Sequence, residues 1–297
     1  MRLPVGGWLR TIRAVLVAVL LTLVLGPPLI VISLFEKTGS TAYLLTRLWA
    51  RLLSRSMGLT FSIQGTEKIA PSVSYIIAPN HQGYVDILAL ITTLPPRFRW
   101  VLKRELLRIP LFGWALGRTG AISLDRSNRE QAMKSLVVGA SKLTGGWSVL
   151  IYPEGTRTPD GNLQHFKKGA FIMAIQTGIP ILPVTCNGAY KIMPKKTIVF
   201  QPGHITVTVG DPIPSEGLTE ADVGRLLDKT RAAVGRHLDT NYDPFRRREQ
   251  ERVGVRGTHT QRKRLDLFYP MMGEQSELGE VEQKLESVRE ESGEPWT

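Results

Sequence analysis

The chain has a single cysteine, Cys186, among its 297 residues. One cysteine excludes an internal disulfide and any C-x-x-C metal or redox site, and it favours a reducing compartment. Because Cys186 lies in an apolar stretch, we interpret it as a packing residue. Four of the five histidines, His165, His204, His237 and His259, are scattered, and none has metal-ligand spacing with another histidine or the cysteine. The sequence therefore predicts no metal site and no cofactor.

Motifs of two other protein classes are also absent. No G-x-S-x-G nucleophile elbow occurs, which weakens a hydrolase interpretation. No nucleic-acid motif or aromatic-interleaved basic stripe occurs, so we do not expect nucleic acid as a partner. The formal net charge is nevertheless +12, and residues 36–244 carry 25 basic and 15 acidic side chains. A basic body of this kind suits phosphorylated ligands or an anionic membrane surface.

Charge is absent from the 22 residues between Ala14 and Phe35. One helix of about 20 residues could cross a bilayer. Pro27-Pro28 divides this run and leaves a first piece only ~20 Å long, so a re-entrant or half-buried hairpin is the alternative. A cleaved signal peptide fits less well, because no A-x-A-like site follows. Basic residues flank both sides, and both ends in the cytoplasm would satisfy the positive-inside rule. We expect a membrane protein whose active site faces the cytoplasm.

Composition divides the chain into three parts. Residues 1–58 are predicted to form membrane-anchoring helices, including an amphipathic helix from about Thr41 to Met57 that lies in the membrane interface or covers the core. Residues 59–244 are predicted to form the catalytic domain. Residues 245–297 form a charged tail that is basic at first and acidic later, and this composition predicts disorder.

In the middle part, short apolar runs alternate with helical stretches. The predicted strands are Thr60–Ile63, Tyr75–Ala78, Trp100–Leu102, Ala121–Leu124, Ser148–Tyr152, Ile181–Thr185, Ile198–Phe200 and Ile205–Val209. The predicted helices are Val85–Leu94, Leu111–Arg118, Arg129–Leu143, Ala170–Thr177 and Glu220–Leu238. This alternation predicts an α/β fold, a single domain with a mixed, largely parallel sheet flanked by helices.

The segment 80–86, with the sequence NHQGYVD, places a histidine and an aspartate five residues apart. Neither a regular helix nor a regular strand would pair side chains at this spacing. At a strand-to-helix turn, however, His81 can close the strand, Gly83 can permit the turn, and Asp86 can lie in the first helical turn. The spacing then predicts a histidine held by a carboxylate, which is a general base. Alone, the pattern is weak.

Three further segments follow strands or include one. They are GAISLDR at 120–126, YPEGTRT at 152–158 and the proline-bracketed GIPILPV at 178–184. Ligand sites in α/β sheets favour the carboxyl ends of strands, where His81, Arg126 and Arg157 lie if these strands are parallel. Arginine binds phosphate bidentately, although either arginine could make a structural salt bridge instead. Lys103 adds a point charge near substrate phosphates, or is a surface lysine.

These four segments together resemble the glycerolipid acyltransferase family, in particular the 1-acyl-glycerol-3-phosphate acyltransferases. They occur in the family's order over roughly residues 60–210, and the combination is specific. The resemblance implies that His81 is the catalytic base, that Asp86 is its partner, and that the proline-bracketed strand supports the acyl-donor side. It also implies an acceptor phosphate site shaped by Arg126, Glu154, Gly155, Thr156 and Arg157. Two positions, Ser123 and Thr158, depart from the family's usual residues, which bears on substrate shape.

The chemistry needs such groups. A glycerol hydroxyl is a poor nucleophile, so a base must remove its proton while it attacks the thioester of acyl-CoA or an acyl carrier protein. Imidazole is mostly neutral near pH 7 and can accept that proton. Asp86 would fix the tautomer and stabilise the imidazolium. Transfer can be direct, because no Ser, Cys or Lys in the four segments demands a covalent intermediate.

The sequence therefore predicts an acyltransferase that acylates the sn-2 hydroxyl of 1-acyl-glycerol 3-phosphate and gives phosphatidate for phospholipid synthesis. The expected partners are a lysophospholipid acceptor, acyl-CoA or acyl carrier protein as the donor, and membrane lipid. One alternative is another acceptor, such as glycerol 3-phosphate, a different lysophospholipid or an aminoacyl lipid. The other is a catalytically inactive, membrane-anchored lipid-binding protein.

Overall fold

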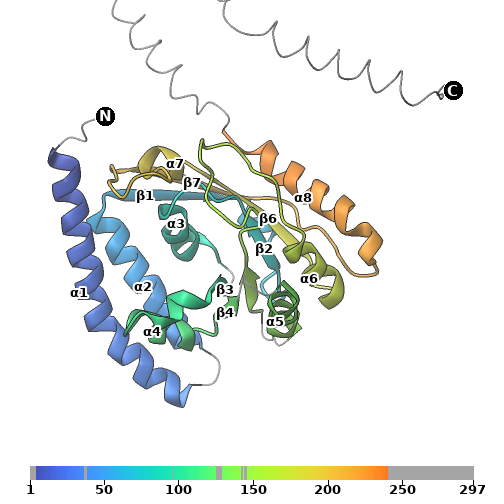
Figure 1. The fold of residues 1–297 in the computed structure, drawn as a ribbon, viewed down its shortest axis with the longest axis horizontal. Helices are drawn as coiled ribbons and strands as arrows, with labels where there is room; N and C mark the ends of the chain where they lie inside the picture. The colour runs from blue at the N-terminus through green and yellow to red at the C-terminus, as the bar shows by residue number, and fades with distance from the viewer. Residues whose placement is uncertain are drawn as a thin grey trace, which may run out of the picture. The chain divides into compact units, whose positions relative to one another are not determined.

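A computed structural model describes residues 5–36, 39–95, 97–124, 129–141, 143 and 146–239. The chain begins with two helices that pack along each other, α1 (Val5–Phe35) and α2 (Ser40–Ser56) (Figure 1). The predicted amphipathic helix corresponds to α2. The charged tail falls beyond residue 239, so its predicted disorder lies outside the described residues.

The helix α1 continues through Pro27 and Pro28. The expectation that these prolines divide the apolar run, and the hairpin alternative built on it, are therefore wrong. Proline removes only its own N–H donor and disturbs the turn before it. Packing of α1 against α2 and α4 (Phe112–Arg118) holds the helix together, because tertiary contacts supply most helical stability in proteins.

Most of α1 is left uncovered. The stretch Gly6–Phe35 is long and apolar enough to cross a membrane, and only 11% of its most apolar window is buried. Its exposed large side chains are Trp8, Leu9, Ile12, Val15, Leu16, Val19, Leu20, Leu23, Val24, Val31, Leu34 and Phe35. An apolar surface of this extent marks an interaction site.

The described residues form one sheet of seven strands in the order β1-β7-β6-β2-β5-β3-β4. The strands are β1 (Leu59–Gln64), β2 (Ile76–Pro79), β3 (Phe98–Lys103), β4 (Ile122–Leu124), β5 (Ser148–Leu150), β6 (Ile181–Asn187) and β7 (Gly203–Val209). Neighbours pair in parallel, except that β6 and β7 are antiparallel. The predicted mixed, largely parallel sheet is confirmed.

Helices cover both faces of the sheet (Figure 1). The remaining α-helices are α3 (Val85–Thr93), α5 (Arg129–Ser141), α6 (Gly169–Thr177), α7 (Ala189–Ile192) and α8 (Val223–Arg236), and the 3₁₀ turns are η1 (Thr66–Lys68), η2 (Arg104–Arg108) and η3 (Glu220–Asp222). On one face Ile77 packs with residues of α2 and α3, and on the other Ile76 packs with α5, α6 and α8. Two covered faces explain why the central strands are apolar throughout rather than alternating.

The predicted strand at Ile198–Phe200 is wrong. In this segment the backbone N–H of Val199 donates to Oγ1 of Thr197 at 3.0 Å, and Gln201 bonds back to the carbonyl of Ile192. Local hydrogen bonds thus take the place of a ladder, and pairing with the sheet begins only at β7. The apolar run that suggested a strand instead buries Val199 and Phe200.

Candidate active site

The parallel pairing brings the carboxyl ends of β2, β3 and β5 to one edge of the sheet. His81 follows β2, Lys103 ends β3, and the segment 152–157 follows β5. The sequence set the condition that the strands before His81, Arg126 and Arg157 run parallel, and β2, β4 and β5 meet it. The predicted phosphate ligand Arg126 follows β4 but lies outside the described residues, so its role stays a prediction.

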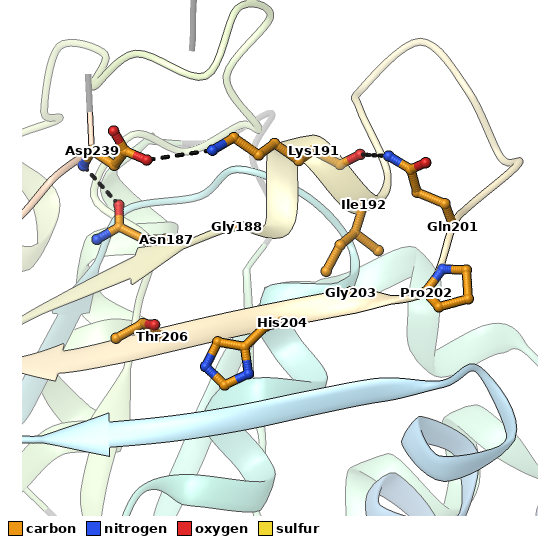
Figure 2. Close-up of a pocket in the computed structure, with 10 residues that line it drawn as sticks. All are labelled: Asn187, Gly188, Lys191, Ile192, Gln201, Pro202, Gly203, His204, Thr206 and Asp239. Carbon is orange, nitrogen blue, oxygen red and sulfur yellow. Dashed lines mark hydrogen bonds and ion pairs between the residues drawn. The ribbon is translucent and has the colours of Figure 1, made fainter. Parts of the chain in front are cut away.

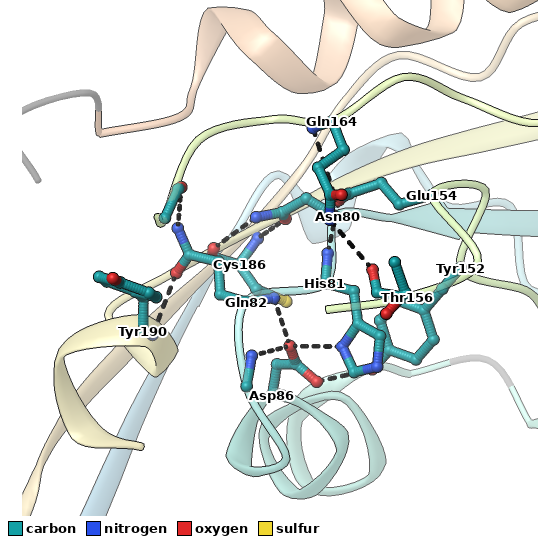
Figure 3. A network of polar contacts seen from close by, with 12 residues as sticks. Asn80, His81, Gln82, Asp86, Tyr152, Glu154, Thr156, Gln164, Cys186 and Tyr190 are labelled. Atoms are coloured by element: carbon teal, nitrogen blue, oxygen red, sulfur yellow. Dashed lines mark hydrogen bonds and ion pairs between the residues drawn. The ribbon is translucent and has the colours of Figure 1, made fainter. Parts of the chain in front are cut away.

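His81 and Asp86 are paired across the turn between β2 and α3. Nδ1 of His81 lies 3.0 Å from Oδ2 of Asp86, and the side chains are 14% and 0% exposed (Figure 3). A carboxylate only accepts hydrogen bonds, so the pairing places the ring hydrogen on Nδ1 and leaves the lone pair on Nε2. This is the tautomer that a general base requires.

The carboxylate of Asp86 is held from four directions. Besides His81, its Oδ2 accepts the backbone N–H groups of Gln82 at 2.8 Å and Gly83 at 2.9 Å. Its Oδ1 accepts the hydroxyl of Tyr152 at 2.9 Å. Burying a carboxylate is costly unless it is fully hydrogen-bonded, and these donors meet that condition. They also fix the direction in which Asp86 meets the imidazole.

The turn itself needs a glycine at position 83. A Cβ atom there would come within 2.9 Å of the carbonyl oxygen of Met193 and 3.0 Å of that of Ala189. The sequence predicted that Gly83 permits the turn. Its φ does not lie in the left-handed region, so the glycine is needed for the close approach of α7 and not for an unusual backbone conformation. A larger residue would push α7 away from the beginning of α3.

Tyr152 is a site residue that the sequence reasoning missed. Its ring stacks on the imidazole of His81, with centroids 3.8 Å apart and planes inclined by 17°. Burial, and then the neighbouring Asp86 charge, raise the pKa of the Tyr152 hydroxyl well above its usual value, so it stays a hydrogen-bond donor. The available signal was its place at the predicted end of a strand, directly before the Glu-Gly-Thr-Arg turn.

Glu154 is buried behind the histidine, at 3% exposure. Its Oε1 accepts the backbone N–H of His81 at 2.8 Å, and its Oε2 accepts the side-chain amide of Gln164 at 3.1 Å. Burial raises the Glu154 pKa to about 7, although hydrogen bonds from His81 and Gln164 oppose the shift. The sequence placed Glu154 in the substrate site. Because both of its carboxylate oxygens already accept hydrogen bonds, we interpret Glu154 as a positioning residue that links the backbone of His81 to the 152–164 segment.

Two amide side chains next to His81 also bond to neighbouring backbone groups, and the sequence reasoning identified neither of them. Asn80 donates to the carbonyl of Cys186 at 3.0 Å and accepts its N–H at 2.7 Å. Gln82 donates to the carbonyl of Gly161 at 3.1 Å. Both are almost fully buried. Their signal was the presence of two polar residues beside His81, immediately after an apolar strand.

The side chain of Arg157 packs against the ring of Tyr84. Its guanidinium carbon lies 3.7 Å from the centroid of the Tyr84 ring. Its Nη1 is buried and has no hydrogen-bond partner among the described residues. A buried, unpaired donor of a charged group is costly, so an anionic ligand at this position would satisfy it.

A cavity of about 1190 Å³ connects these groups to the N-terminal helices. Near the strand ends its lining includes the polar or charged residues His81, Tyr84, Lys103, Tyr152, Thr156, Arg157 and Lys167, together with Gly155. The rest of the lining is mainly apolar and comes largely from α1, α2, α3 and the η2–α4 region. The predicted residues His81, Lys103, Gly155, Thr156 and Arg157 therefore share one cavity.

A smaller hollow of about 280 Å³ lies between α7 and β7 (Figure 2). It shares no lining residue with the large cavity. Its polar groups bond to one another or to neighbouring side chains, as in the 3.4 Å ion pair between Lys191 and Asp239. Nothing in this hollow calls for a ligand.

Comparisons with known proteins place the chain in a family. The Acyltransferase family model matches residues 60–187. Human 1-acyl-sn-glycerol-3-phosphate acyltransferase alpha is 35% identical over 178 residues, which cover 60% of this chain and 63% of the human protein. The 1-acyl-sn-glycerol-3-phosphate acyltransferase of Saccharomyces cerevisiae is 32% identical over 205 residues, covering 68% of this chain and 67% of the yeast protein.

A solved structure shows the same fold. The crystal structure of the 1-acyl-sn-glycerophosphate acyltransferase PlsC from Thermotoga maritima matches with a TM-score of 0.68 and 22% identity, covering 86% of this chain and 98% of the other. This chain spans about 63% of the length of the human relative. The match covers two thirds of the yeast relative, and the family model and the paired histidine and aspartate agree with it. The chain therefore belongs to the glycerolipid acyltransferase family, of the 1-acylglycerol-3-phosphate acyltransferase type.

Proposed function

We propose that this protein transfers a fatty acyl group from a thioester donor to the sn-2 hydroxyl of 1-acyl-glycerol 3-phosphate. The observation that carries the proposal is the His81–Asp86 pair, whose histidine lines a largely apolar cavity. The names of the relatives supply the acceptor, and the cationic lining of the cavity fits its phosphate. The donor is acyl-CoA or acyl carrier protein, both of which present the same thioester.

In the proposed reaction, Nε2 of His81 takes the proton of the acceptor hydroxyl as its oxygen attacks the thioester carbonyl. Asp86 stabilises the imidazolium that forms. The tetrahedral intermediate then collapses, the C–S bond breaks, and the imidazolium returns the proton to the leaving thiolate. The products are phosphatidate and a free thiol. Acid–base assistance of this kind is worth about 10²- to 10⁴-fold in rate.

Arg157 is the proposed phosphate ligand, because its buried Nη1 lacks an acceptor among the described residues. Lys103 and Lys167, which line the same cavity, add point charges for the acceptor or donor phosphates. The apolar part of the cavity takes an acyl chain, for which each CH₂ removed from water contributes ~0.8 kcal/mol.

Membrane association belongs to this proposal. The uncovered apolar surface of α1 would lie in the bilayer, where both the lysolipid and a long acyl chain dissolve. The active site would face the cytoplasm, which the basic residues on both sides of the apolar run favour. Lipid chains would then reach the cavity without first entering water.

Purified full-length protein in lipid nanodiscs provides the test. Acyl-CoA and acyl carrier protein donors are each offered with 1-acyl-glycerol 3-phosphate, glycerol 3-phosphate, a choline lysophospholipid and 1-monoacylglycerol. We expect phosphatidate as the main product with at least one donor. If the protein prefers a different acceptor, that acceptor replaces 1-acyl-glycerol 3-phosphate as the proposed substrate. If no acceptor gives an ester, the alternative of a catalytically inactive lipid-binding protein remains.

Two variants test the mechanism. His81→Ala and Asp86→Asn should lower kcat by about 10³-fold or more, since the pair acts as a unit. His204→Ala is the matched control, because the side chain of His204 is exposed on β7 and its ring bonds to the side chains of Thr60 and Ser62, away from the cavity lining. Full activity in His81→Ala would rule out this mechanism.

A further inference from the structure

The segment from Lys103 to Thr119, which contains η2 and α4, packs beside the N-terminal helices. A Cβ atom at Gly26 of α1 would come within 3.1 Å of the Leu111 side chain. The rings of Trp49 in α2 and Phe112 in α4 lie 6.4 Å apart. This η2–α4 segment is therefore fixed against α1 and α2 rather than being a free loop.

The η2–α4 segment carries large apolar side chains that no other described residue covers. Leu106, Ile109 and Trp114 are 39%, 44% and 61% exposed. A tryptophan exposed to this degree on a well-packed segment marks an interaction surface rather than a packing residue. The segment packs against α1, whose own large apolar side chains are also exposed.

Basic residues flank these apolar ones along the chain. Lys103, Arg104, Arg108 and Arg118 are all exposed, and the one acidic residue between Lys103 and Thr119 is Glu105. Exposed tryptophan and aliphatic side chains flanked by arginine and lysine are the composition of a membrane-interface segment. Basic residues near an anionic bilayer surface contribute about 1 kcal/mol each. The occupant that fits this surface is an anionic lipid bilayer.

The inner side of the same segment lines the large cavity. Leu106, Phe112, Ala115, Leu116 and Thr119 are all lining residues. Ile109 and Trp114 are exposed but do not line the cavity, so this wall element has the cavity on one side and the exterior on the other. If the exterior is lipid, a lipid chain moves from the bilayer into the cavity past this wall.

We propose that the η2–α4 segment is a second membrane contact, separate from α1, which seats the mouth of the cavity in the surface of an anionic bilayer. The inference rests on the proposed membrane association. It does not depend on catalysis, so its main test reads lipid contact directly.

That test uses cysteine labelling. Cys186 is fully buried, and burial raises the pKa of its thiol, so it does not react under mild conditions. Ile109→Cys and Trp114→Cys are each labelled with the fluorophore NBD and reconstituted in vesicles of anionic and zwitterionic phospholipid. Val138→Cys is the matched control. Val138 is 43% exposed, and its helix α5 covers the face of the sheet opposite to α2 and α3.

Labels at 109 and 114 should be quenched by nitroxide-bearing lipid and protected from aqueous iodide, whereas the label at 138 should show the reverse. Equal iodide quenching at all three positions would overturn the proposal. Protection from iodide without nitroxide quenching would also overturn it, because that result indicates contact with a second copy of the chain.

Charge reversal gives an independent readout. The double variant Arg108→Glu/Arg118→Glu should lower the rate on anionic vesicles at least threefold and leave the rate on a short-chain monomeric acceptor unchanged. Lys229→Glu on α8, which also changes an exposed basic residue, should alter neither rate. An equal loss on both substrates would count against membrane seating. If the wild-type protein acylates no acceptor, the proposed function is wrong. The quenching experiment would still decide whether the η2–α4 segment contacts lipid, because it does not require activity.

Discussion

The guanidinium of Arg157 lies over the ring of Tyr84, with 3.7 Å between the guanidinium carbon and the ring centroid. The two residues come from different strand ends, and both line the large cavity. Tyr84 is 51% exposed, so its ring forms a platform rather than part of the core. The ring fixes the plane of the guanidinium, whose buried Nη1 has no acceptor among the described residues.

The Tyr84 platform predicts a change in acceptor binding. A cation–π contact is worth about 0.5–2 kcal/mol, so Tyr84→Ala should raise the KM for 1-acyl-glycerol 3-phosphate by about 2- to 30-fold. Tyr84→Phe keeps the ring and should restore the wild-type KM. Arg157→Lys should raise the KM at least as much as Tyr84→Ala, because lysine cannot bind phosphate bidentately. Steady-state kinetics with 1-monoacylglycerol, which lacks the phosphate, provide the control, and an equal loss there would contradict the assignment.

A second prediction concerns the hydroxyl of Tyr152. Tyr152→Phe keeps the ring that stacks on His81 but removes the donor to Oδ1 of Asp86. A hydrogen bond to a charged group is worth about 1.5–3 kcal/mol, so kcat should fall by roughly 10- to 100-fold with little change in KM. Tyr152→Ala should lose more, because the stacking is lost as well. Circular dichroism checks the fold of both variants, and an unchanged kcat in Tyr152→Phe would show that the other donors suffice.

Sequence reasoning identified this site because its motifs directly follow apolar strands. His81 and Arg157 each follow a buried apolar run, and parallel pairing of such runs brings their ends together. Glu154 was recognised, but the sequence could not show which way its carboxylate points. It bonds the backbone of His81, a contact between residues far apart in the chain that no local pattern records. The path of α1 through its prolines was missed for the same reason, since tertiary packing outweighs the local preference.

Glu154 yields a prediction about pH. Its pKa is raised from 4.5 to about 7 by burial, so the native state holds the proton more tightly than the unfolded chain does. The stabilisation from protonation is therefore fully present below about pH 4.5 and is lost as pH rises through about 7, by roughly 3 kcal/mol at most. Glu154→Gln cannot titrate and should lack this component.

The measurement is the thermal unfolding midpoint in detergent at pH 5 and pH 8. The midpoint of the wild-type protein should fall by several degrees more than that of Glu154→Gln between these two values. The comparison between the two proteins removes the contribution of every other titrating group. An identical pH dependence would mean that Glu154 keeps its charge over the whole range.

The last prediction concerns the acyl chain. Ala18 lies on α1 and lines the apolar part of the cavity, whereas its neighbour Val19 is 52% exposed and does not line it. Ala18→Phe should therefore fill space that a long chain occupies, and each methylene that loses its place costs ~0.8 kcal/mol. The kcat/KM for long-chain acceptors or donors should fall by at least tenfold relative to short-chain ones, and Val19→Phe should leave the ratio unchanged. Competition assays with mixed acyl chain lengths measure this ratio directly. A parallel loss at every chain length in Ala18→Phe would place the acyl chain elsewhere, because a blocked cavity must discriminate by length.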